Sequence, residues 1–172
     1  MTALVVVVML AQADAGASLV IDDGRLKAHP LEGVWQLDLE KSTDTAPILE
    51  KLGVNWFVRQ VAKSARPVHR LRVNDNTLFL EIEASVAKKR FQLVLDGKTP
   101  TKDEFFGDAL EYTTVLENGA FVSTGKMTDP AKKAGITLNR SLRDDGLMLY
   151  RITLLPEGQE PIVIDRVFRR KP

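Results

Sequence analysis

Apolar and polar residues alternate with a period of two through most of the chain. In the segment 33–41 (GVWQLDLEK), Trp35, Leu37 and Leu39 alternate with polar residues. This period is typical of a β-strand that buries one face. The same period returns after Pro67 and continues to the C-terminus. The pattern therefore predicts one early strand and a long run of later ones.

Turn signals divide the later residues into separate strands. Asn118-Gly119 is the strongest, because this pair favours the two-residue turn of a β-hairpin. Similar signals occur at Asp75-Asn76, Asp96-Gly97 and Asp144-Asp145-Gly146. About ten strands are predicted, over residues 33–41, 68–74, 77–85, 89–95, 99–106, 109–117, 120–127, 136–143, 147–155 and 161–170. Short strands at this spacing indicate an all-β barrel or sandwich.

Between the first two strands the period changes to that of an α-helix. Ser, Thr and Asp residues precede Pro47, a combination typical of a helix start, while Gly53 interrupts the pattern and Pro67 ends it. Two short helices are predicted, over about 46–52 and 55–65. The second has apolar residues at helical spacing: Trp56, Val58, Val61, Ala62 and Ala65.

Two arginines interrupt apolar strand faces. Every second residue of two late strands reads Ile136-Leu138-Arg140-Leu142 and Ile162-Ile164-Arg166-Phe168. Arginine stays protonated in proteins, and burying an unpaired charge is costly. Inward arginines therefore need an anion, ordered water or both. No internal acid is evident on the third and sixth predicted strands, since their acidic residues fall on the outer faces: Glu81, Glu83, Glu111 and Glu117.

Each arginine also has a structural interpretation. It can extend to water from a strand end, or stack on Trp35 at the base of a barrel. Arg151 is a third candidate, but both faces of its strand are apolar and leave its direction open. A guanidinium fork matches a carboxylate, and apolar walls suit an acyl chain at roughly 0.8 kcal/mol per buried methylene. From the residues alone, a site for a carboxylate and a structural role therefore both stay open.

Several stretches carry a family resemblance. GVWQL, EKLGVNWFVRQVAKSARP and RVNDNTLFLEIEAS follow one another, and VLENGAFV, ITLNRSLRDDGLML and DRVFRR come later. In this order they resemble the opening strand, helical lid, next hairpin and last four strands of the intracellular lipid-binding proteins. This is the fatty-acid-binding and cellular retinoid-binding group of the calycin superfamily. The similarity covers residues 31–172, with an inserted segment at 127–135 and a longer turn at 156–161.

The resemblance implies a ten-stranded antiparallel up-and-down β-barrel over residues 31–172, with a helix–turn–helix lid between the first two strands. In members that bind carboxylates, an arginine of the eighth strand and an Arg-x-Tyr of the last strand hold the head group. Arg140 matches the first and Arg166 the second, while Phe168 stands at the tyrosine position. Val86 takes the place of a phenylalanine at the portal.

Four further residues are candidate ligand contacts. Tyr112 is inward by alternation and is placed to offer its hydroxyl to a head group, or to serve as a wall aromatic. Leu49, Val54 and Ala62 of the lid are candidate contacts for the acyl chain. The alternative for these three is packing of the lid on the barrel.

Composition narrows the function classes. The 172 residues are 44% hydrophobic and 27% charged, as in one globular domain. A net charge of +1 with scattered basic residues argues against nucleic-acid binding. There is no cysteine, and neither His29 nor His69 lies in a nucleophile or metal-ligand pattern. We expect a binding protein rather than an enzyme, without metal or cofactor.

The N-terminal residues resemble a secretory signal peptide. A short apolar run, Ala3–Leu10, precedes overlapping Ala-x-Ala triplets over residues 11–17, although no basic residue precedes the run. The run is too short to span a bilayer. Residues 1–17 are predicted to be a signal peptide and 18–30 a linker. The protein is then periplasmic or secreted, and otherwise cytoplasmic.

These observations predict a monomer that binds a long-chain fatty acid or similar apolar carboxylate non-covalently, for transport or storage. At most, the helical lid contacts a membrane transiently. Two alternatives stay open at this point. One is a lipocalin-type barrel for another apolar ligand, and the other is an interaction module in which the arginines are structural.

Overall fold

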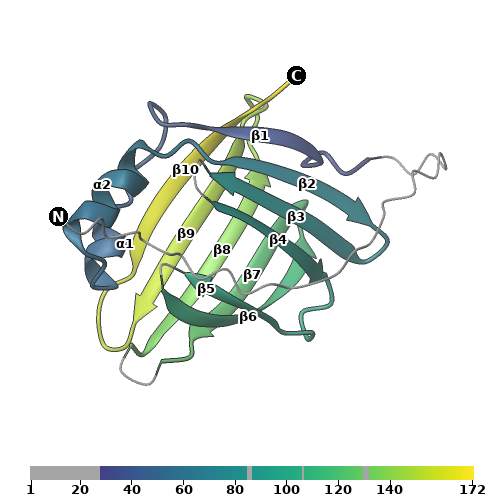
Figure 1. Ribbon diagram of the computed structural model, residues 1–172. Helices are drawn as coiled ribbons and strands as arrows, with labels where there is room; N and C mark the ends of the chain where they lie inside the picture. Colours follow the sequence, from purple (N-terminus) through teal and green to yellow (C-terminus); the bar gives the residue numbers. More distant parts are fainter. Residues whose placement is uncertain (1–27, 85–86, 106, 130–131) are drawn as a thin grey trace.

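The computed structural model describes residues 28–84, 87–105, 107–129 and 132–172. These residues form ten strands and two helices (Figure 1). In chain order the elements are β1 Gly33–Asp38, α1 Ala46–Lys51, α2 Trp56–Ser64, β2 Val68–Asn74, β3 Thr77–Ala84, β4 Ala87–Val94, β5 Thr101–Phe105, β6 Asp108–Glu117, β7 Ala120–Met127, β8 Ala134–Leu142, β9 Met148–Pro156 and β10 Ile162–Arg170. Every predicted strand and helix is present, with ends that differ by a few residues.

The strands form one antiparallel sheet that curls into a nearly closed barrel. Their order is β4-β3-β2-β1-β10-β9-β8-β7-β6-β5, so β4 and β5 are its two edges. Side chains bridge the seam between these edges, because Lys89 donates to the Asp103 carboxylate and to the Glu104 carbonyl at 2.8 and 2.6 Å. Just beyond the end of β4, Asp96 forms an isolated antiparallel bridge with Val115 of β6. The predicted ten-stranded up-and-down barrel is confirmed.

β1 ends at Asp38, earlier than the alternation predicted. The Asp38 carboxylate accepts a hydrogen bond from the Glu40 backbone N–H, and the Ser42 hydroxyl donates to the Asp38 carbonyl. Local side-chain bonds of this kind compete with a strand ladder. The β1 ladder ends here, and the chain stays bonded to β10 as it continues into the lid, since the Val167 N–H donates to the Ser42 hydroxyl at 2.9 Å.

The hairpin predicted at Asn118-Gly119 is confirmed. Asn118 and Gly119 have φ values of 50° and 75°, as a two-residue turn requires. The β6–β7 ladder runs up to the pair Glu117 and Ala120 on either side of this turn.

Trp35 closes one end of the barrel. Its indole is fully buried and donates to the Leu31 carbonyl at 2.9 Å. The guanidinium carbon of Arg170 lies 4.3 Å from the centroid of the Trp35 ring. Gly33 leaves room for this contact, since a Cβ there would lie 2.5 Å from Arg170 Nη1. Stacking on Trp35, a role considered for the inward arginines, is therefore filled by Arg170.

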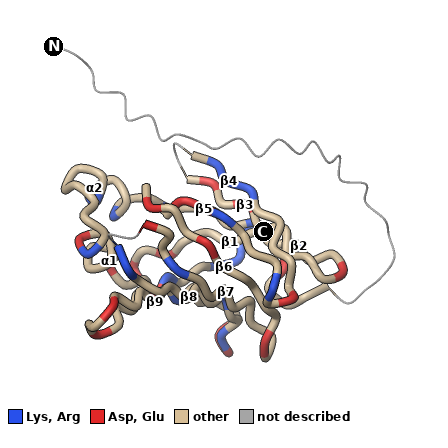
Figure 2. Tube along the Cα trace, turned by 90° about the horizontal axis from the view of Figure 1, so that it is seen from below, with Lys and Arg blue, Asp and Glu red and all other residues tan. Residues whose placement is uncertain are grey.

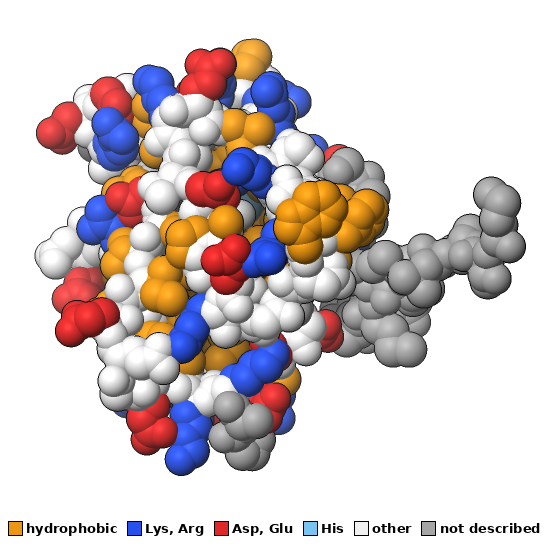
Figure 3. Space-filling view, turned by 90° about the vertical axis from the view of Figure 1, so that its left-hand side faces the viewer, with side chains coloured by type: hydrophobic (Ala, Val, Ile, Leu, Met, Phe, Trp, Pro, Cys, Tyr) orange, Lys and Arg blue, Asp and Glu red, His pale blue; other side chains and the backbone are white. Residues whose placement is uncertain are grey.

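The two helices cover the other end (Figure 1). α1 buries Ile48 and Leu49, whereas α2 buries no residue fully. Trp56 and Phe57 are 65% and 62% exposed, and Figure 3 shows hydrophobic side chains on the face of the molecule that carries the helices. The apolar stripe that predicted α2 therefore packs only partly on the barrel. Neither described helix has the length and hydropathy needed to cross a membrane.

Candidate functional site

Arg140, Tyr150 and Arg166 form a row across the inner faces of β8, β9 and β10. Tyr150 is the cross-strand partner of both arginines. Arg140, Tyr150 and Arg166 are 2%, 9% and 8% exposed, respectively. Both arginines thus point into the barrel, in the direction that the alternation predicted.

Among the described residues, neither guanidinium of this row forms an ion pair. The Cζ of Arg140 lies 4.0 Å from the centroid of the Tyr150 ring, and its Nε has no hydrogen-bond partner. Arg166 Nη1 donates to the Thr43 carbonyl at 2.9 Å. Burial lowers the pKa of Arg166, and the charge of Asp44 acts in the opposite direction. The interior therefore holds two cations with incomplete compensation.

His69 completes the cluster, although the sequence indicated no role for it. It is 3% exposed on β2, and its Nδ1 has no hydrogen-bond partner among the residues that the structure describes. Its ring centroid lies 4.4 Å from that of Phe168 and 5.7 Å from that of Tyr150. Burial, followed by the charges of Arg140 and Arg166, holds the pKa of His69 well below its usual value. Burial and the two cations therefore both disfavour protonation of this imidazole.

Asp103 corrects the expectation that the interior carries no acid. On β5 it lies opposite Leu110, which is 1% exposed and inward. Burial raises the pKa of the Tyr112 and Tyr150 hydroxyls, and the charge of Asp103 adds to this effect. Asp103 is itself paired with Lys89 at 2.8 Å. Its charge is thus matched at the seam and does not neutralise the arginine row.

Arg151 lies on the outer face of β9. Its Nε and Nη2 donate to the two oxygens of Asp165 at 2.7 and 2.8 Å. These bonds lower the pKa of the Asp165 carboxyl. The inclusion of Arg151 among the ligand contacts is therefore wrong, because its guanidinium is committed to a surface ion pair.

The remaining predicted contacts fall in different places. Tyr112 is 4% exposed and belongs to the interior cluster of apolar side chains. Leu49 of the lid helix α1 is fully buried, Val54 packs against the same cluster, and Ala62 is half-buried. Val86 lies outside the described residues.

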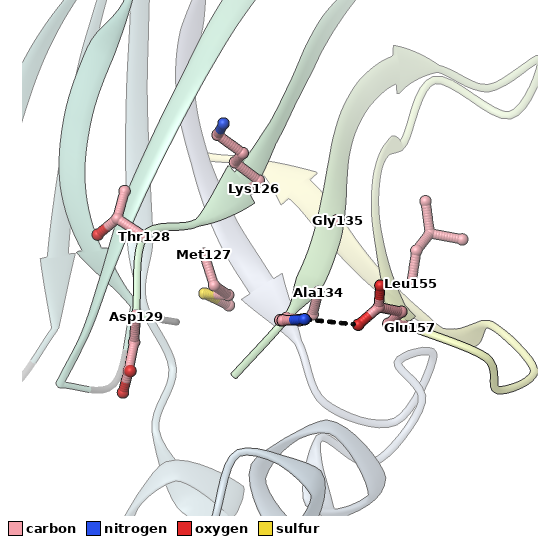
Figure 4. Close-up of a pocket in the computed structure, with 9 residues that line it drawn as sticks. Lys126, Met127, Thr128, Asp129, Ala134, Gly135, Leu155 and Glu157 are labelled. Carbon is pink, nitrogen blue, oxygen red and sulfur yellow. Dashed lines mark ion pairs between the residues drawn. The ribbon is translucent and has the colours of Figure 1, made fainter. Parts of the chain in front are cut away.

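The lid end of the barrel has two surface hollows. The larger, about 560 Å³, lies between the end of β7, the start of β8 and the end of β9, around Met127, Ala134 and Leu155 (Figure 4). The smaller, about 400 Å³, adjoins α1 at Leu52. Lys132, within the inserted segment, donates to the Leu52 carbonyl at 3.1 Å and to the Asp108 carboxylate at 2.5 Å. The insertion therefore fastens α1 to the barrel.

Buried apolar side chains of the described residues form one cluster, which includes Tyr150 of the arginine row. Leu110, Ile136 and Leu154 are each 1% exposed, and Ile164 is 2% exposed. The described interior is therefore filled largely by apolar side chains that pack on one another.

Solved structures of lipid-binding proteins share this architecture. The fatty acid transporter REP1-NXSQ matches with a TM-score of 0.68 and 16% identity, over 83% of this chain and 96% of that one. A Schistosoma mansoni fatty acid binding protein in complex with arachidonic acid matches at 0.66 and 16%, over 83% and 97%. Caenorhabditis elegans lipid binding protein 8 matches at 0.68 and 15%, over 83% and 96%.

This chain has the fold of the intracellular lipid-binding proteins. No family model and no curated protein sequence matches it. The compared structures carry names of binding and transport proteins. The likeness thus establishes the fold, while the function depends on the chemistry of the site.

The described residues also bear on the requirements of a metal site, a catalytic histidine and a charged binding surface. No three His, Asp or Glu side chains among them are arranged to hold a metal ion. His29 packs against Phe121, with 4.7 Å between ring centroids. Acidic and basic residues are interspersed along the described strands and turns (Figure 2).

A sequence signal for His69 was present. His69, Leu71 and Val73 alternate with polar or basic residues in the same way as the other strands, so the period-two rule places His69 inward. Tyr150 lies on a strand whose two faces are both apolar, so alternation does not decide its side. Its position between the arginines follows from the β8–β9–β10 register.

Proposed function

We propose that the barrel binds a long-chain fatty acid, or a similar apolar carboxylate, without a covalent bond. One observation carries the proposal. Arg140 and Arg166 are buried in one row, with no carboxylate partner among the described residues. Buried charges are strongly disfavoured unless they are paired. The row therefore favours an anionic ligand.

A carboxylate suits this row in charge and in shape. Guanidinium groups present parallel N–H donors that match the two oxygens of a carboxylate. The unpartnered Nε of Arg140 is such a donor. The head group is accordingly assigned to the space between Arg140 and Arg166, beside Tyr150.

The acyl chain is assigned to the apolar cluster of buried side chains next to Arg140, Tyr150 and Arg166. Each methylene removed from water contributes roughly 0.8 kcal/mol. Passage into the barrel requires movement, because the inward side chains are in contact. We expect α2 to yield first, since it buries no residue fully.

Displacement of a fluorescent fatty acid tests the carboxylate assignment. Oleic acid and oleyl alcohol share the same chain and differ only in the head group. We expect oleic acid to displace the probe and oleyl alcohol to be at least about tenfold weaker, as one hydrogen bond to a charged group implies. Equal displacement by both would remove the carboxylate from the proposal.

One observation favours a second function. Arg166 already donates to the Thr43 carbonyl and so ties β10 to the segment before α1. In that reading the arginines are structural, and the barrel takes a different apolar ligand or serves as an interaction module. Equal displacement by oleic acid and oleyl alcohol supports a different apolar ligand. No displacement by either compound supports the interaction module.

We also propose that the protein is a monomeric, non-enzymatic carrier or store. The names of the compared structures, a fatty acid transporter and a fatty acid binding protein, support the carrier part of this proposal. We also propose transient contact of the lid with membranes, because Trp56 and Phe57 present exposed aromatic surface on α2. Export through the N-terminal signal-like segment is part of the same proposal.

A further inference from the structure

We propose that His69 is the third polar contact of the ligand head group and makes the site selective for acids. The inference rests on the proposed carboxylate site and adds a residue from a distant strand. Its basis is a juxtaposition: β2 places His69 against the same interior space as the row formed by Arg140, Tyr150 and Arg166.

The imidazole is held in place by two rings. Phe168 lies at 4.4 Å with an interplanar angle of 34°, and Tyr150 lies edge-on at 5.7 Å. Phe168 has no hydroxyl to offer a head group. Next to it, His69 keeps a buried Nδ1 without a hydrogen-bond partner. Buried polar atoms are rarely left unpaired, and those that are call for an explanation.

The charges around His69 come from one side. Its cross-strand partners on β1 and β3 are Trp35 and Ile82, which carry no charge. The charges that act on it are those of Arg140 and Arg166, and the Tyr150 ring between these arginines lies edge-on to it. The two cations oppose protonation of the imidazole. A carboxylate bound between them offsets that repulsion and makes protonation of His69 easier. Anion binding and proton uptake at His69 are therefore linked.

Binding of oleic acid and oleyl alcohol to the full chain tests the assignment. For His69→Leu we expect about tenfold weaker oleic acid binding, the value of one hydrogen bond to a charged group, with alcohol binding changed less than about twofold. His69→Gln should recover most of the loss, because its amide can donate. Leu71→Ala is the matched control, a buried inward residue two positions along β2. It should weaken acid and alcohol alike.

A spectroscopic readout separates a head-group contact from a packing role. The chain has two histidines, so the imidazole signals in NMR spectra of labelled protein are few. Adding oleate should shift the His69 signals and raise the pH at which His69 titrates. His29, which packs on Phe121, should not change and serves as the internal control.

The outcomes are separable. Oleic acid binding by the wild-type chain, with equal losses for acid and alcohol in His69→Leu or no shift of His69 with oleate, overturns this inference and leaves the carboxylate site standing. A wild-type chain that does not bind oleic acid overturns the proposed function and this assignment with it. If His69→Leu does not fold, the Gln variant and the wild-type titration decide the question.

Discussion

Arg140 and Arg166 share a row but are accommodated differently. Arg140 lies over the Tyr150 ring and keeps an unpartnered Nε, whereas Arg166 satisfies one donor with the Thr43 carbonyl. Of the two, Arg140 is therefore the more available for a ligand. Arg166 combines a ligand position with a tie to the segment before the lid.

Replacing these arginines tests that difference. Arg140→Leu should weaken oleic acid binding by about tenfold or more. It should leave the free energy of unfolding unchanged or higher, because an apolar residue in place of a buried charge is often stabilising. Arg166→Leu should weaken the acid similarly but gain less stability, since the Thr43 carbonyl loses its donor. Thermal melts beside binding curves measure both effects.

Arg151→Leu is the matched control for the arginine variants. It removes the same group from the outer face, where Arg151 pairs with Asp165. We expect no change in acid binding and a stability cost below about 1 kcal/mol, as for exposed pairs. A lower melting temperature in Arg140→Leu, with acid and alcohol binding reduced equally, would assign Arg140 a structural role instead.

His69 predicts a pH dependence of stability. Its pKa in the folded protein is well below the ordinary 6.5, so below that pH the unfolded chain takes up a proton that the folded chain does not. The contribution of His69 to the free energy of unfolding is therefore fully present above about pH 6.5. Below that pH the free energy of unfolding falls, by up to about 1.4 kcal/mol per pH unit. Urea unfolding at several pH values measures this. The free energy of unfolding should fall less steeply with decreasing pH in His69→Gln than in the wild-type protein. An identical slope contradicts the prediction.

At the scale of elements, the lid is held unevenly. α1 is buried through Ile48 and Leu49 and is fastened at its C-terminal end by Lys132. α2 has an N-cap bond from Val58 N–H to the Asn55 side chain but no fully buried residue. The first helix is thus expected to stay docked when the second moves.

Lys132→Met tests the fastening of α1. The change leaves the Asp108 carboxylate, 6% exposed, without its cation. A buried polar group left without its partner should lower the free energy of unfolding by about 1–3 kcal/mol. Amides of α1 should exchange with solvent faster. Adding Asp108→Asn to Lys132→Met should recover part of the loss, and unchanged exchange in the single variant would contradict the role of Lys132.

Trp56 offers a direct readout of membrane contact. The two tryptophans differ in environment, since Trp35 is fully buried and Trp56 is 65% exposed. Vesicles that bind the lid should therefore shift the emission of Trp56 to shorter wavelength, as the indole leaves water. Trp56→Phe should abolish the shift while keeping Trp35 emission. Unchanged emission of the wild-type protein over a range of vesicle compositions would argue against lid contact.

On the scale of the whole molecule, the barrel has three closures of different kinds. Trp35 with Arg170 closes one end, the helices cover the other, and Lys89 bridges the seam to Asp103. Only the seam lacks a strand ladder, because β4 and β5 are the two sheet edges. Separating β4 from β5 therefore breaks fewer backbone hydrogen bonds than separating any other pair of adjacent strands in the described sheet.

The N-terminal segment carries a prediction for the whole chain. Cleavage after one of the Ala-x-Ala triplets should leave a mature protein that begins near Asp14, Gly16 or Ser18. N-terminal sequencing of protein from its native host measures this, and the cellular fraction gives the compartment. An intact Met1, or Thr2 after removal of Met1 alone, would place the protein in the cytoplasm.

The sequence by itself determined the strands, both lid helices, the hairpin at Asn118 and the inward direction of Arg140 and Arg166. These features depend on local rules, because a strand with one buried face has a period of two and a turn with positive φ favours Asn-Gly. The face of Asp103 escaped the same rule, since β5 has only five residues and its alternation is too brief to assign a side.

The tertiary structure alone decided which side chains meet. The register of β8, β9 and β10 puts Tyr150 between the two arginines, and the pairing of both β2 and β10 with β1 brings His69 against Phe168. It also paired Arg151 with Asp165 on the outside and gave the Trp35 stack to Arg170. Alternation assigns a residue to a face, but its partners on that face depend on the pairing of strands distant in sequence.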